Sequence, residues 1–147
     1  MADRVSASIT LGGTIDAATY QDLALCIAGE ILSTDWDGPI FAPDHRHEGE
    51  PLRLFAREVS WGRFEELEAF CVATGIAFAR WSDAYPGQWG CERVVHRGDG
   101  ALHGYAVDGD DVVMIDRQTV ERLGTLDAIF AHFGEADVII PPLVVTG

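Results

Sequence analysis

The chain has 147 residues, 48% of them hydrophobic, and carries 24 acidic against 10 basic residues, for a formal net charge of −14. This excess of negative charge repels phosphate groups, so direct binding to nucleic acid or to an anionic membrane is not expected. No apolar run approaches the roughly 20 residues that span a bilayer and no signal peptide is evident, so we expect one globular domain over residues 1–147, located in the cytoplasm.

The N-terminal part of the sequence predicts a strand followed by a helix. Residues 4–11 alternate between apolar and polar side chains, which is typical of a half-buried strand, and Gly12-Gly13 is expected to break it. Apolar residues then recur at helical spacing over residues 17–32, with Asp16 in the position of an N-cap. Residues 33–51 form the longest irregular segment, and a loop of this length is often functional.

The middle of the chain predicts a strand, a helix and a strand over residues 52–81. A helix is expected over residues 62–74, because apolar residues line one side of it and Gly75 offers a stop. The segment is long enough for a crossover connection between two parallel strands. A hairpin is expected over residues 91–107, with Asp99-Gly100 as a two-residue turn.

The C-terminal part predicts a strand, a broken helix and further strands. Residues 112–115 read as a strand, and a helix over residues 116–134 is expected to break at Gly124-Thr125. Residues 136–140 are predicted to form another strand, and residues 143–145 a short edge extension after two prolines.

These elements together predict an α+β fold. We expect a two-layer sandwich in which a mostly antiparallel sheet of six or seven strands carries about three helices on one face. A ferredoxin-like topology, with two crossover units, is the preferred arrangement.

Two histidine pairs raise the question of a metal or proton-transfer site. His45 and His47 lie two residues apart in an acidic loop, but Arg46 between them repels a cation, so we expect a solvated loop. In the predicted hairpin, His96 stands opposite His103 on one face of the sheet. An exposed pair near the hairpin tip is the favoured interpretation, and no bound metal or other cofactor is predicted.

A third candidate site is a predicted edge of the sheet where strands end and helices begin. We expect turns after three strands to meet there and to offer backbone amides, flat aromatic area and charge to a ligand. The predicted ligand-binding residues are Gly12, Gly13, Trp61, Arg80, Trp81, Asp83 and Trp89. The alternative is that the tryptophans cap a small core.

The sequence contains no recognisable catalytic signature, so the leading hypothesis is a non-enzymatic binding or accessory module that engages a protein partner or a small ligand. One alternative is a small metal-assisted hydrolase or isomerase that uses a histidine pair. Another is an acidic protein that imitates nucleic acid and inhibits a basic protein, although the carboxylates are scattered along the chain. Exposed strand edges also leave a homodimer open.

Overall fold

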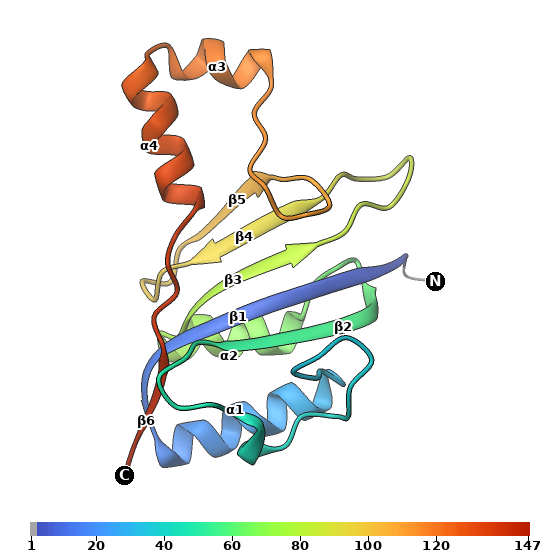
Figure 1. The fold of residues 1–147 in the computed structure, drawn as a ribbon, viewed down its shortest axis with the longest axis vertical. Coiled ribbons are helices and arrows are strands. Elements are labelled where there is room, and N and C mark those ends of the chain that lie inside the picture. Colours follow the sequence, from blue (N-terminus) through green and yellow to red (C-terminus); the bar gives the residue numbers. More distant parts are fainter. Residues whose placement is uncertain (1–2) are drawn as a thin grey trace.

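The computed structural model describes residues 3–147, which form a six-stranded β-sheet and four α-helices (Figure 1). The strands are β1 (Arg4–Asp16), β2 (Leu52–Ser60), β3 (Ala77–Ser82), β4 (Glu92–His96), β5 (Leu102–Ala106) and β6 (Leu143–Thr146). The helices are α1 (Ala17–Gly29), α2 (Glu65–Thr74), α3 (Arg117–Leu123) and α4 (Leu126–Ala136), and Pro43–His45 form a short 3₁₀ turn.

The sheet has the strand order β2-β1-β3-β4-β5, with antiparallel pairing throughout that path, and β6 pairs in parallel with the last part of β1 (Figure 1). The predicted α+β class and mostly antiparallel sheet are therefore confirmed. The ferredoxin-like topology is not confirmed. Although β2 and β3 run parallel on either side of β1, the strands that α1 connects, β1 and β2, are direct antiparallel neighbours.

The first strand is longer than predicted, because Gly12 and Gly13 do not break it. Gly12 pairs with Ala77 of β3, and Gly13 donates its N–H to the carbonyl oxygen of Pro142 at 3.1 Å. A Cβ on Gly12 would lie 1.8 Å from the carbonyl oxygen of Pro141. Glycine therefore permits a close approach of two backbones here. Such an approach is a common reason for a glycine inside a strand, as an alternative to a break in the strand.

The main hydrophobic core lies between the sheet and the helices α1 and α2. The alternation predicted for β1 is confirmed, since Ile9 and Leu11 are buried, and they pack in one cluster with Leu23 of α1 and Leu67 of α2. Full burial of side chains of this size stabilises the fold by about 1.5–3 kcal/mol each. Asp16 caps α1 as predicted, because its carboxylate accepts the N–H of Thr19 at 2.7 Å.

A second, smaller cluster forms on the opposite face of the sheet. Its members are Val95, Tyr105, Val107, Val113 and Ala136. Arg93 connects this face to the C-terminal helices, since its Nε lies 2.9 Å from the Asp111 carboxylate and its Nη1 2.8 Å from that of Asp137. The end of α4 thus packs on the face that α1 and α2 leave free, and a two-layer sandwich with all helices on one face is not confirmed.

The C-terminal third agrees with the prediction at the helix break and differs from it in two places. The helix breaks as expected, and it does so because Gly124 ends α3 in the left-handed conformation and Thr125 caps α4. A strand over residues 136–140 is wrong, since α4 continues to Ala136 and the next residues cross the sheet without pairing. Of the strand predicted over residues 112–115, only a bridge between Val107 and Val113 forms.

Within residues 3–147, no helix is long and apolar enough to cross a membrane.

Candidate functional site

The antiparallel sheet separates the predicted ligand-binding residues instead of gathering them at one edge. Ser60 and Ser82, which precede the turns with Trp61 and Asp83, pair with residues near the start of β1. Gly12 and Gly13 lie at the other end, because β1 runs in the opposite direction to β2 and β3. The parallel strands on which the prediction depended would have brought all three turns together.

Gly12, Gly13 and Trp81 lie in structural positions away from the remaining residues. Gly12 is buried beneath the C-terminal segment, and the N–H of Gly13 is used in its hydrogen bond to Pro142. Trp81 lies on the opposite face, where it packs against the smaller cluster and its Nε1 donates to the carbonyl oxygen of Asp108 at 3.2 Å. The structure does bring Trp61, Asp83 and Trp89 to one end of the sheet.

A groove lies beside these residues, where the sheet extends beyond the helix layer. It consists of a cavity of about 760 Å³ and an adjoining one of about 400 Å³, both lined by Arg63 and Glu65 at the start of α2. We call it the α2–β5 groove. The larger cavity is also lined by Trp61, Ser82, Trp89, Gly90, Cys91, Glu92, Gly104, Tyr105 and Ala106. The smaller, more apolar cavity is completed by Glu68, Ala69, Val72, Ala73 and Leu102.

Aromatic rings form one wall of the groove. The rings of Trp61 and Trp89 lie 5.7 Å apart, and Tyr85 stacks on Trp89 at 5.2 Å. Trp89 is held further by the hydrogen bond from its Nε1 to the carbonyl oxygen of Asp83, at 3.1 Å. Trp61 is 49% exposed, so a large aromatic surface that is held in place from one side remains open to a ligand.

Arg80 lies under this wall and is only 3% exposed. Its Nη1 donates to the carbonyl oxygen of Gly62 at 2.9 Å and to the hydroxyl oxygen of Ser82 at 3.1 Å, which fixes the turn that carries Trp61. Its Nε lies 3.0 Å from Glu68 as an ion pair but finds no hydrogen-bond partner in the described residues. Arg80 is thus placed to position the groove from below.

Two carboxylates give the groove its charge. Nη2 of Arg80 lies 3.7 Å from Glu92, whose side chain is 47% exposed, and Glu65 is exposed at the start of α2. The deeper Glu68 is largely buried; burial raises the pKa of its carboxyl, and Arg80 opposes that rise.

Cys91 lines the groove but has none of the properties of an activated nucleophile. Burial raises the pKa of the Cys91 thiol, and its sulfur lies 3.5 Å from the carboxylate of Asp83, which raises the pKa further. No histidine of residues 3–147 lines the groove to act as its base. The uncharged thiol is the weakly nucleophilic form.

The predicted pairing of His96 with His103 is wrong. His96 pairs with Leu102, and His103 pairs with Val95, so the two imidazoles lie on opposite faces of the sheet. The connection between the two strands spans residues 97–101, and the buried His96 ring bonds within it. Its Nε2 accepts the N–H of Gly100 at 3.0 Å, so Nδ1 carries the proton and donates to the carbonyl oxygen of Ile76 at 2.7 Å.

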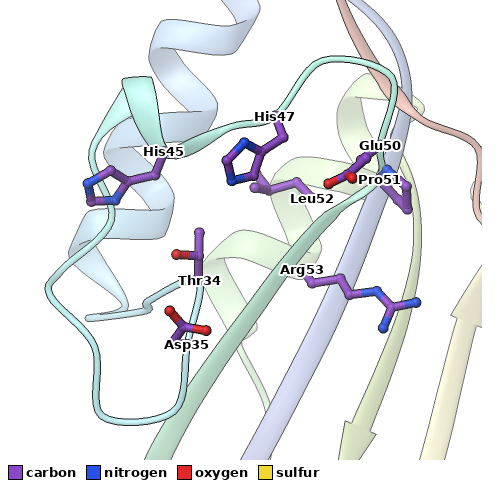
Figure 2. A pocket seen from close by; sticks show the side chains of 8 residues that line it. All are labelled: Thr34, Asp35, His45, His47, Glu50, Pro51, Leu52 and Arg53. Atoms are coloured by element: carbon purple, nitrogen blue, oxygen red, sulfur yellow. The ribbon is translucent and has the colours of Figure 1, made fainter.

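The His45 and His47 loop surrounds a separate cavity of about 440 Å³ (Figure 2). His45 lies in the 3₁₀ turn, where its Nδ1 accepts the N–H of Ala42 at 3.1 Å, and its ring points away from His47. Arg46 donates to the carbonyl oxygen of Leu143 at 3.0 Å, which ties the loop to β6. The described residues contain no group of three or more histidine, cysteine or acidic residues that could hold a metal ion.

Sequence reasoning missed three residues that shape the groove, namely Arg63, Glu65 and Gly104. A glycine inside the predicted hairpin of residues 91–107 was the available signal for Gly104, because it often marks a site of close approach. Comparisons with protein-family models, curated proteins and solved structures found no match to this chain. Its function is therefore inferred from the residues of the groove.

Proposed function

We propose that the protein is a non-enzymatic binding module that holds a cationic group of its ligand in the α2–β5 groove. The observation that carries the proposal is the exposed Trp61 beside the half-buried Trp89, in one cavity with Glu65 and Glu92. A guanidinium or ammonium group over an indole ring gains about 0.5–1 kcal/mol at an exposed site and about 2 kcal/mol when it is desolvated.

The charge balance of the groove favours a cation over an anion. Glu65 and Glu92 outnumber Arg63 among the charged residues of the larger cavity, and the buried pair of Arg80 and Glu68 cancels below it. The net charge of −14 adds an attraction for positive ligands that salt weakens. We also propose that the protein acts in the cytoplasm as a single domain, which the three free cysteines support.

The test uses N-acetyl-arginine amide as a probe and the four tryptophan indole N–H signals as reporters in an NMR titration. Binding in the groove is expected to shift the signals of Trp61 and Trp89 and to leave those of Trp36 and Trp81 unchanged, because the latter lie outside the groove. N-acetyl-citrulline amide, which has the same shape without the charge, is expected to produce no shift.

Two matched variants complete the test. Glu92→Gln keeps the shape of the side chain, removes its charge and is expected to weaken probe binding several-fold. Trp36→Leu removes an aromatic ring of similar exposure (38%) outside the groove and is expected to leave binding unchanged. Equal shifts at all four tryptophans, or equal binding of the citrulline probe, would contradict the proposal.

A further inference from the structure

We infer that the ligand is an extended, basic segment of a partner protein, which adds to the free edge of β5 as a further strand. The inference rests on the proposed function, because it identifies what carries the cationic group into the α2–β5 groove. It is argued from the hydrogen-bonding pattern of β5, from the missing side chain at Gly104 and from the charge of the groove.

The backbone of β5 has open hydrogen-bonding groups on its outer edge. Val107 donates its N–H to the carbonyl oxygen of Cys91, which places alternate residues of β5 in bonds to β4 and directs Leu102 and Gly104 outward. The carbonyl oxygen of Ala106 faces the same way and accepts the N–H of Met114 at 2.9 Å. Leu102 is 53% exposed and Gly104 is exposed, and no segment of residues 3–147 pairs with either of them on that edge. Unpaired strand edges of this kind accept an additional strand.

Gly104 leaves a path from this edge into the groove. Its position pairs with Val94 of β4 and lies on the face that carries Glu92, and a Cβ there would come within 3.4 Å of a Glu92 carboxylate oxygen. A long side chain on an added strand therefore meets no Cβ at Gly104 and is directed toward Glu92, which lines the same cavity as Trp89. Arginine and lysine have both the length and the charge that this path requires.

The negative charge of the protein favours a basic segment over a second copy of this chain as the strand that binds at the free edge of β5. Two copies would each bring a net charge of −14 to the contact, and their like charges repel. A basic segment is attracted by the same field and by Glu65 and Glu92 at the groove itself. The apolar surface of Val72, Ala73 and Leu102 in the smaller cavity then accommodates a neighbouring apolar side chain of the segment.

The test compares four probes by isothermal titration calorimetry: N-acetyl-arginine amide, a seven-residue peptide that alternates arginine with threonine, and two versions of that peptide. One version carries N-methyl groups on the arginines and the other on the threonines, so each blocks the N–H groups along one edge of the extended peptide. The unmodified peptide is expected to bind about tenfold or more tightly than the amino-acid amide, and only one N-methylated version to lose that gain.

The protein side is tested with Gly104→Pro, which removes the outward N–H, against Gly104→Ala, which keeps it. Proline is tolerated on an edge strand whose N–H faces solvent, and Gly104 is not in the left-handed conformation. The quantity compared is the ratio of peptide affinity to N-acetyl-arginine amide affinity, because an effect on the cation site acts on both probes. This ratio is expected to be several-fold smaller for the proline variant than for the alanine variant. Circular dichroism verifies that both variants are folded, and the N-methylated peptides test the same bonds on the unaltered protein.

The outcomes separate this inference from the proposed function. If N-acetyl-arginine amide still shifts Trp61 and Trp89 but both N-methylated peptides bind as tightly as the parent, strand addition is wrong and the cation site stands. If neither the amide nor the peptide binds, both fail. A concentration-dependent dimer in sedimentation velocity, abolished by Gly104→Pro, would identify a second copy as the occupant and overturn the inference.

Discussion

Replacing Arg80 with leucine is expected to destabilise the protein by about 3–5 kcal/mol at neutral pH, the range measured when one partner of a buried ion pair is removed. Arg80 is 3% exposed and Glu68 only 12%, so the change leaves a largely buried carboxylate without its cation. The carbonyl oxygen of Gly62 also loses a charged donor. The free energy of unfolding of a domain is typically about 5–15 kcal/mol, so a large share of the stability is at stake.

The loss caused by Arg80→Leu is expected to depend on pH in a defined direction. Burial already raises the pKa of Glu68, and removal of Arg80 raises it further because the opposing charge is gone. A carboxyl with a raised pKa destabilises the folded state above that pKa and no longer does so once it is protonated. The difference in unfolding free energy between wild type and variant should therefore be largest near pH 7.5 and shrink as the pH falls through the raised pKa.

Urea denaturation at pH 7.5 and pH 5 measures this difference, with two further variants for comparison. Arg80→Leu combined with Glu68→Gln is expected to recover part of the loss, because no buried charge remains. Arg117→Leu removes an exposed pair with Glu121 and should cost less than about 0.5 kcal/mol. The reasoning would be refuted if Arg80→Leu cost no more than Arg117→Leu, or if the cost were the same at both pH values and in the double variant.

Three other features of the fold give shorter predictions. Gly12→Ala should destabilise by about 1–3 kcal/mol or more in urea denaturation, because its Cβ would meet the backbone of Pro141, whereas Gly134→Ala in an open helical position should stabilise by up to about 1 kcal/mol. Hydrogen bonds lower the pKa of Asp16, and they stabilise the fold at pH values above the ordinary pKa of an aspartate. This stabilisation is lost as the pH falls through the lowered pKa. Asp16→Asn should therefore make the melting temperature less sensitive to acid between pH 5 and pH 2. Burial raises the pKa of Cys71 to about 12, so a thiol-specific reagent at pH 8 should modify Cys71 only after unfolding; rapid modification of the native protein would contradict its burial.

Local patterns predicted the elements of this fold better than their arrangement. The alternation in β1, the N-cap at Asp16 and the break at Gly124 depend on neighbours a few residues away, and all three are confirmed. The direction of each strand is decided by contacts between distant residues, such as that of Gly12 with Ala77. A shared edge for Gly12 and Trp61 could therefore not be established from local sequence.

The candidate site was predictable only in part for the same reason. Trp61 and Trp89 stood out as aromatic residues in turns, and the structure places them together. The predicted pairing of His96 did not take into account that its ring is buried and bonds the carbonyl oxygen of Ile76, which lies 20 residues away and outside the reach of turn rules. Arg80 was expected at a ligand surface, but its burial depends on Glu68, which lies on a different element.

The pairing of β6 with β1 has a consequence for how the chain folds during synthesis. Gly13 cannot pair with Leu143 until the ribosome has added that residue, 130 residues later (143 − 13). Closing so long a loop is entropically costly and contacts of such separation slow folding, so residues 13–16 at the end of the first strand are expected to be the last part of the sheet to become ordered. Until then its unsatisfied backbone is open to mispairing, and a nascent-chain chaperone would find its target there.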